Sequence, residues 1–119
     1  MEDHRKLRVW KQSHEHAVAV RGACRGFQRG QYASLLTQIT RAAESVVFNI
    51  AEGCGAASAK QFARFLDIAI KSTRELEAQL ELAKDYGALK PIRWTSLNLG
   101  TISIRRQPCA LRARVVASS

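Results

Sequence analysis

Cysteine and proline are scarce in this chain, with three cysteines and two prolines among 119 residues. Cys24, Cys54 and Cys109 are odd in number, widely spaced and free of any Cys-x-x-Cys motif, which argues against a disulfide framework and a zinc site. We expect reduced thiols, with Cys24 on an apolar seam. With 46% apolar residues and so few prolines, the chain can bury the core of a single helical domain.

Long hydrophobic runs are also missing. No apolar stretch approaches the roughly 20 residues that span a bilayer, and the amino-terminal Met-Glu-Asp-His-Arg-Lys has no hydrophobic signal core behind it. We therefore expect a cytoplasmic protein with no membrane partner.

The residues that carry catalysis or hold metals show no recognisable arrangement. His14 and His16 are two positions apart, so they point to different sides of a helix and cannot share a metal ion. No Glu-x-x-His motif occurs, which argues against a di-iron carboxylate bundle. Gly53-Cys-Gly-Ala-Ala-Ser58 has the look of a nucleotide loop, but a helix rather than a strand precedes it, so a helix stop and restart explains it better. We expect no catalytic residues, no metal and no cofactor.

Three helices are predicted from apolar residues that recur at alternating three- and four-residue steps. The first should cover about residues 7–25, and the second should run from residue 31 or 32 to Gly53, where a glycine can take the left-handed conformation that closes a helix. The third should begin at the capping box Ser58-Ala-Lys-Gln61 and end near Gly87. Its apolar seam is the most regular in the chain: Phe62, Leu66, Ala69, Thr73, Leu76, Leu80 and Ala83. Short connections between long helices predict an all-α, up-down antiparallel bundle.

A polar stripe accompanies the seam of the second predicted helix. Its members are Gln38, Arg41, Ser45, Asn49 and Glu52. Hydrogen-bonding groups at the border of a core usually set the register of neighbouring helices or meet a partner. We expect Arg41 and Glu75 to form a half-buried pair, because an apolar-flanked arginine would otherwise lack an acceptor. The alternative is two unrelated surface charges.

Acidic residues are absent from positions 91–119, which hold five arginines. These positions are also rich in poor helix formers and show no sustained helical period. We therefore divide the chain into a three-helix core, residues 1–90, and a basic tail, residues 91–119, that forms a short helix or an irregular segment over part of the bundle.

The charge of the whole chain favours acidic partners. Nineteen basic and ten acidic residues give a formal net charge of +9, as in proteins that bind nucleic acid or anionic lipid. The candidate nucleic-acid-binding residues are Arg21, Arg25, Arg29, Lys60, Arg64, Lys71 and Arg74. Aromatic residues are only 7% of the chain, which disfavours a base-stacking surface. Plain solubilising surface charge is the alternative interpretation of the same residues.

Four blocks of the sequence together resemble a known family. They are Leu7-Arg-Val-Trp10, Gln38-x-x-Arg41-Ala-Ala-x-Ser45-x-x-x-Asn49-Ile-Ala-Glu52-Gly53, Phe62-x-x-Phe65-Leu66-x-x-Ala69 and Ser72-x-x-Glu75-Leu76-Glu77. Over about residues 5–90 the chain is similar to the bacterial four-helix-bundle proteins also called 23S ribosomal RNA intervening sequence proteins. The resemblance implies a cytosolic up-down bundle that assembles into a homopentamer, and it implies no established biochemical activity.

The resemblance also suggests partners. Some relatives are encoded within insertions in ribosomal RNA genes, and the similar accessory proteins of diversity-generating retroelements associate with nucleic acid and a reverse transcriptase. We therefore expect a non-catalytic oligomer that binds RNA or DNA, with a protein-interaction scaffold as the alternative. The family motif positions are expected to form a structural polar network where the second and third helices meet: Gln38, Arg41, Ser45, Asn49, Glu52, Ser72 and Glu75.

The chain departs from the family pattern after Lys90. Relatives continue with a charged amphipathic fourth helix, whereas residues 93–119 are arginine-rich, acid-free and aperiodic. We consider a reading-frame change near this point as a hypothesis. If the tail replaces a helix that contributes to subunit contacts, the pentamer is also affected.

Overall fold

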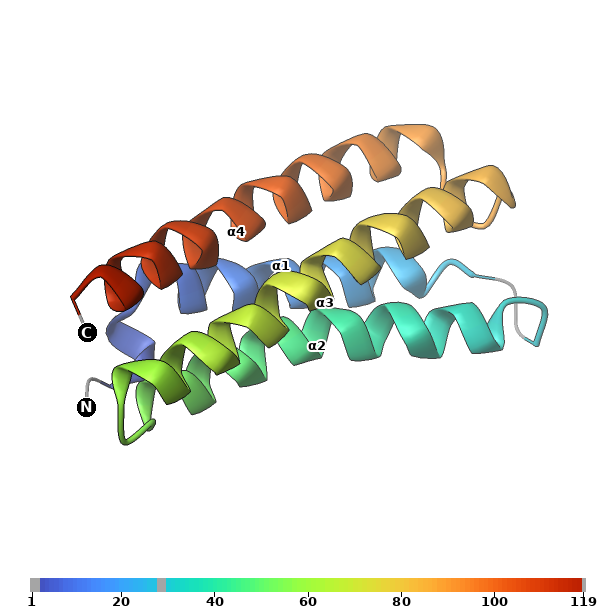
Figure 1. Ribbon diagram of the computed structural model, residues 1–119. Helices are drawn as coiled ribbons and strands as arrows, with labels where there is room; N and C mark the ends of the chain where they lie inside the picture. The colour runs from blue at the N-terminus through green and yellow to red at the C-terminus, as the bar shows by residue number, and fades with distance from the viewer. Residues whose placement is uncertain (1–2, 28–29, 119) are drawn as a thin grey trace.

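The computed structural model describes residues 3–27 and 30–118. A short 3-10 turn, η1 (His4–Lys6), precedes four helices: α1 (Arg8–Cys24), α2 (Ala33–Cys54), α3 (Ala59–Asp85) and α4 (Pro91–Ala117). The helices lie side by side and alternate in direction along a bundle that measures 46 × 21 × 20 Å (Figure 1). The predicted all-α, up-down bundle is confirmed.

Each helix packs against two of the others. Contacts join α1 to α2, α2 to α3, α3 to α4 and α4 back to α1, so α1 and α3 occupy opposite corners of the bundle. Because the directions alternate, the two ends of the chain lie at the same end of the molecule (Figure 1). None of the described helices combines the length and the apolar character that a bilayer span requires.

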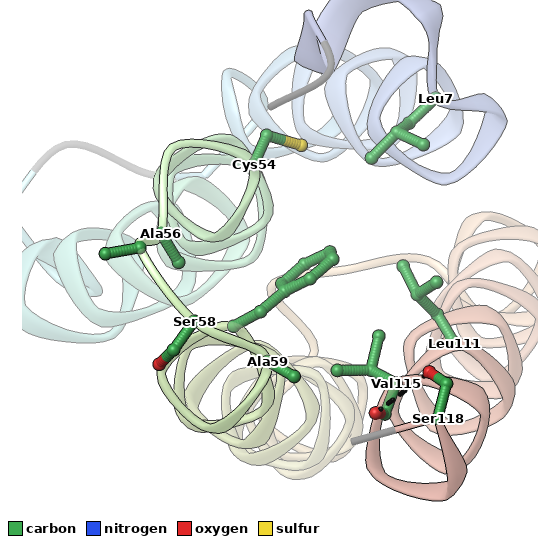
Figure 2. A pocket seen from close by; sticks show the side chains of 10 residues that line it. Leu7, Cys54, Ala56, Ser58, Ala59, Leu111, Val115 and Ser118 are labelled. Carbon is green, nitrogen blue, oxygen red and sulfur yellow. Dashed lines mark hydrogen bonds between the residues drawn. The ribbon is translucent and has the colours of Figure 1, made fainter.

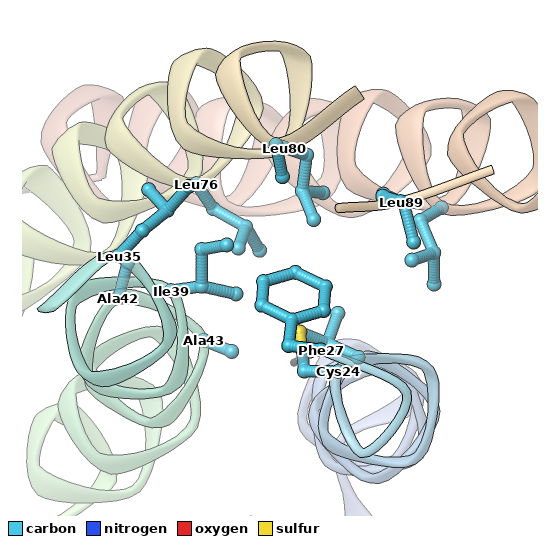
Figure 3. Close-up of a cluster of buried hydrophobic side chains, with 12 residues drawn as sticks. Cys24, Phe27, Leu35, Ile39, Ala42, Ala43, Leu76, Leu80 and Leu89 are labelled. Carbon is cyan, nitrogen blue, oxygen red and sulfur yellow. The ribbon is translucent and has the colours of Figure 1, made fainter. Parts of the chain in front are cut away.

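Buried side chains form two clusters along the bundle axis. The larger cluster lies near the α1–α2 connection and contains Val20, Cys24, Phe27, Leu35, Ile39, Ala42, Ala43, Leu76, Leu80, Ala83, Leu89 and Leu97. Figure 3 shows the Phe27 ring pointing into this cluster toward Ile39. The smaller cluster contains Val9, Val46, Ile50, Ala69 and Ile104. Both clusters draw residues from α4, so the core extends beyond residues 1–90.

The predicted seam of the third helix is confirmed. All its members except the half-buried Phe62 are buried, and Leu66 and Leu80 are 0% exposed. Full burial of a leucine side chain stabilises a fold by about 1.5–3 kcal/mol. The alternating three- and four-residue steps therefore identify the face of α3 that holds the bundle together.

Both ends of α3 follow local signals in the sequence. Ser58 Oγ accepts the Gln61 N–H at 3.1 Å, and Gln61 Oε1 accepts the Ala57 N–H at 2.8 Å, so the capping box forms with the glutamine reaching one residue further back than usual. At the other end Gly87 has a φ of +82°, in the left-handed region. Such a residue is typical of a helix end, and the predicted end of the third helix is confirmed.

Gly53 has a different role from the predicted one. The positive φ values among the described residues belong to Gly30 and Gly87, and α2 continues through Gly53 to Cys54. A Cβ atom at Gly53 would lie 2.8 Å from Cδ1 of Phe62 and 3.3 Å from Cβ of Phe65. The absence of a side chain therefore lets α3 approach α2 closely, and helix closure is not what requires glycine here.

The prediction of a weak or irregular fourth element is wrong, because residues 91–117 form one 27-residue helix. Pro91 lies in its first turn, where a missing N–H group leaves no hydrogen bond unmade. Leu97, Thr101, Ile104 and Pro108 are buried and follow each other by four, three and four positions. A seam of helical period is therefore present in α4.

Two features hide that seam in the sequence. Thr101 and Pro108 occupy buried positions, although neither residue type favours a helix interior. Ile92 and Leu99 lie on the outer side and are 80% and 63% exposed. Because apolar residues occur on both sides of the helix, no single amphipathic face is visible from the sequence. Packing against α1 and α3 selects the helical conformation.

Candidate nucleic-acid interface

The candidate basic residues fall on two separate surfaces. Arg21 on α1 and Arg25 at its C-cap are exposed, whereas Lys60, Arg64, Lys71 and Arg74 are exposed on α3. Arg29 lies outside the described residues. Because α1 and α3 stand at opposite corners of the bundle, the candidates do not form one continuous patch on a single chain.

The first surface is a groove between α1 and α2, with a volume of about 380 Å³. We name it the α1–α2 groove and define it by its lining residues: His14, Ala17, Val18, Arg21, Arg25, Thr40, Glu44, Val47 and Phe48. Arg21 and Arg25 are one helical turn apart, so they lie on the same side of α1. Neither forms an ion pair with any described acid. Both guanidinium groups are therefore available to an external anion.

The second surface lies between α3 and α4. Lys60, Arg64, Asp67 and Arg112 line a shallow hollow of about 330 Å³ there. Arg112 donates to the carboxylate of Asp67, so part of the positive charge is neutralised within the chain. This surface therefore offers less free positive charge to phosphates than its lysine and arginine residues alone suggest.

The acid-free segment 91–119 supplies cations to acids on α3. Arg105 donates to Glu77 Oε1 at 2.7 Å, and the arginine is only 17% exposed at its side chain. Lys84 of α3 lies over the ring of Trp94, 3.9 Å from the centroid, which is a cation–π contact. The charge imbalance of the tail thus partly reflects pairing between α3 and α4.

The predicted polar network forms in part. Ser45 and Ser72 share a hydroxyl hydrogen bond of 2.7 Å between α2 and α3. Asn49 donates from Nδ2 to the Ser45 carbonyl oxygen at 2.8 Å and to Ser45 Oγ at 3.1 Å. The serine pair joins α2 to α3, and Asn49 supports Ser45 from within α2.

The other four network candidates do not join the two helices. Gln38 donates to a serine one turn earlier on its own helix, at 3.3 Å, and Arg41, Glu52 and Glu75 are exposed. In particular, Arg41 and Glu75 form no ion pair in the described structure. The expected half-buried pair is therefore absent, because both side chains reach solvent and neither needs a buried partner.

His16 is a half-buried residue between α1 and α4, a position that the sequence does not indicate. Thr101 Oγ donates to the Leu97 carbonyl oxygen at 2.8 Å, so the 2.8 Å contact between the same hydroxyl and His16 Nε2 requires the ring to donate. A Cβ atom at Gly100 would lie 2.7 Å from Cε1 of the ring. The imidazole therefore packs on the bare backbone of α4, and burial lowers the pKa of His16 to about 4.

An apolar pocket of about 480 Å³ opens at the end of the bundle where the chain termini lie. Leu111 and Val115 of α4 face the α2–α3 connection across it (Figure 2). The small residues Ala56, Ala57 and Ala59 leave this space unfilled. A general acid–base site is expected to hold a pair of titratable groups at hydrogen-bond distance. The residues that line this pocket include no such pair.

Metal-binding and redox chemistry have no evident centre in residues 3–27 and 30–118. No group of three or more His, Cys, Asp and Glu side chains there could hold a metal ion. Cys24 and Cys54 are buried and Cys109 is exposed, and none forms a disulfide. Burial raises the pKa of the Cys24 thiol to about 11, so this cysteine acts as a small apolar core residue.

Comparison with known proteins identifies the family. No curated protein matches the chain. One solved structure, described as a protein of unknown function from the S23 ribosomal protein family of Bacteroides thetaiotaomicron, superposes with a TM-score of 0.81 at 27% identity, covering 87% of this chain and 97% of that one.

The sequence profile of the 23S rRNA-intervening sequence proteins matches residues 5–107. The match continues beyond Lys90 into α4, so the predicted departure at that point is wrong. The match and the buried seam of α4 leave no support for a reading-frame change there. The chain belongs to the 23S rRNA-intervening sequence protein family.

Proposed function

We propose that this protein is a non-catalytic homo-oligomer that binds the phosphate backbone of RNA or DNA. The observation that carries the proposal is the pair of exposed arginines, Arg21 and Arg25, which line the α1–α2 groove without an internal ion-pair partner. Guanidinium groups bind phosphate oxygens through paired N–H donors. The excess of nine positive charges would add long-range attraction for a polyanion.

Phosphate contact makes affinity depend steeply on salt. Each phosphate neutralised on a duplex lowers the slope of log affinity against log salt by about 0.9. We therefore expect a labelled structured RNA to bind at low salt and to dissociate steeply as salt rises. Absence of binding by the wild-type protein at low salt would exclude the proposal.

Three double variants locate the contact surface, because each removes two positive charges from exposed positions. They are Arg21→Ala with Arg25→Ala, Lys60→Ala with Arg64→Ala, and Lys71→Ala with Arg74→Ala. If the α1–α2 groove holds two phosphates, the first variant should reduce the slope by about 1.8. Equal effects in all three variants would indicate general charge attraction without a defined surface. Adding Arg29→Ala to the first variant extends the test to the remaining candidate arginine.

A protein-interaction scaffold is the second candidate function, and it too has an observation in its favour. Large apolar side chains are exposed at eight positions of the described chain: Val18, Phe48, Ile68, Leu82, Tyr86, Ile92, Leu99 and Val116. They are spread over all four helices, and those that come together in one patch would be typical of a protein interface. Self-association would cover such surface, and the family resemblance suggests five copies.

Light scattering at several concentrations tests the assembly. A mass five times that of the 13.2 kDa chain would support the pentamer, whereas a monomer at all concentrations would exclude self-association. The cytoplasmic location expected from the sequence stays a prediction.

A further inference from the structure

The α1–α2 groove combines exposed rings with cations. Phe48 of α2 is 61% exposed, and His14 of α1 lines the same groove. Arg21 lies about two helical turns beyond His14 on α1, and Arg25, the residue that caps this helix, lies about three turns beyond it. The groove therefore has an aromatic part and a cationic part along one path.

The aromatic part continues along α1. Trp10 stacks on His14 with ring centroids 5.0 Å apart and an angle of 29° between the planes. His14 is exposed and Trp10 is half-buried, so the tryptophan supports the imidazole from the core side. Two ring systems from different helices, Phe48 and His14, thus border one groove. This concentration of rings is not apparent from the overall aromatic content of the chain.

We infer that the α1–α2 groove binds an unpaired segment of RNA or DNA, with a base against Phe48 and phosphates at Arg21 and Arg25. The inference rests on the proposed function, and it names the class of nucleic acid. Aromatic rings stack on bases only when the base faces are free, which is the case in single strands. The two arginines lie about 6 Å apart along the helix axis, which suits consecutive phosphates of an extended strand.

A duplex fits this groove less well. In a duplex the faces of the bases are covered by their neighbours, so Phe48 could not reach them. An apolar peptide would use Phe48 and Val18, but it would leave the two arginines without acceptors, unless it also carried acids. The combination of cations and rings therefore favours a single strand over a duplex, and an acidic peptide becomes an alternative that the experiment separates.

The test measures fluorescence anisotropy of a labelled oligouridylate and of a duplex RNA of equal length, in a salt series. Phe48→Ala is compared with Ile68→Ala, a matched control that removes a 45% exposed apolar side chain from α3. Base stacking on one aromatic side chain changes affinity by about 5- to 150-fold. We expect Phe48→Ala to weaken oligouridylate binding by this factor, with duplex binding unchanged. Phe48→Tyr keeps a ring and should restore binding.

The arginines should contribute the salt dependence. For a single strand, replacing Arg21 and Arg25 by alanine should reduce the slope by about 1.4, because each phosphate contributes about 0.7. Phe48→Ala should leave the slope unchanged, since the ring carries no charge. This separation of slope from affinity distinguishes a stacking residue from a merely structural one.

Three outcomes would overturn the inference. Equal effects of Phe48→Ala and Ile68→Ala on oligouridylate binding would leave the proposed phosphate binding in place but remove the stacking site. A change of molecular mass in Phe48→Ala, with unchanged affinity for oligouridylate, would show that a second copy of the chain, and not a base, covers the groove. If the wild-type protein binds neither RNA at low salt, the proposed function fails as well.

Discussion

Acidification should destabilise the bundle through His16. The ring is neutral in the fold, donates to Thr101 and packs on the backbone at Gly100. Burial lowers its pKa from 6.5 to about 4. The unfolded chain therefore binds a proton below pH 6.5 that the folded chain excludes. Above pH 6.5 both states are neutral, so the group has no effect on the pH dependence there.

The size of the effect follows from this difference in pKa. Between pH 6.5 and about 4 the free energy of unfolding should fall by about 1.4 kcal/mol per pH unit, and by about 3 kcal/mol in total. At pH 5 the loss should be about 2 kcal/mol. Glu15 lines the same shallow hollow as His16 but forms no ion pair with it, so it does not offset the buried charge.

Urea unfolding followed by circular dichroism measures this loss at pH 7.5 and pH 5. The matched control is His16→Gln, which keeps a side-chain N–H donor for Thr101 and does not titrate. The wild-type protein should lose about 2 kcal/mol more than the variant between the two pH values. Equal losses of unfolding free energy in the wild-type protein and in His16→Gln would refute this prediction, because they would mean that His16 binds its proton equally well in the folded and unfolded states.

Three further predictions concern packing and reactivity. Gly100→Ala should destabilise the wild-type protein by about 1–3 kcal/mol, since the new methyl group would overlap His16. In a His16→Ala background the same change should stabilise the protein by up to about 1 kcal/mol, because alanine favours helices. A change of the same sign in both backgrounds would contradict this contact. Ser72→Ala should lower the free energy of unfolding by about 1 kcal/mol in a urea titration, because its hydroxyl partner on α2 loses a bond, and an unchanged midpoint argues against it. Cys109 is exposed, whereas Cys24 is 1% exposed and has a raised pKa. A thiol reagent should therefore modify Cys109 before Cys24 in the native protein. Equal rates of modification would disprove the burial of Cys24.

Local sequence signals predicted the first three helices because each carries its own period. The seam from Leu66 to Ala83, the capping box at Ser58 and the glycine at residue 87 each depend on residues only a few positions apart. Such signals are readable without knowing which helices pack together. The fourth helix was missed because Thr101 and Pro108 complete its seam only once α1 and α3 surround them.

The candidate site depended more on tertiary structure. The sequence identified Arg21 and Arg25 as basic residues on one side of a helix, but it separated them by more than twenty positions from Phe48. The ring and the arginines line one groove because α2 packs against α1. The expected Arg41 and Glu75 pair failed for the opposite reason, since exposure on the assembled bundle removes any need for mutual neutralisation.

By itself, the sequence determined the helical class, the buried face of α3 and the positive charge, which arise from interactions over one or two turns or from composition, and four motif blocks indicated the family. Only the tertiary structure decided that residues 91–117 complete the bundle, that His16 bonds to a threonine 85 positions away, and that rings and arginines share a groove. These features depend on which side chains are buried and on how close segments remote in the chain come to each other. The local periodicity of a sequence gives information on neither.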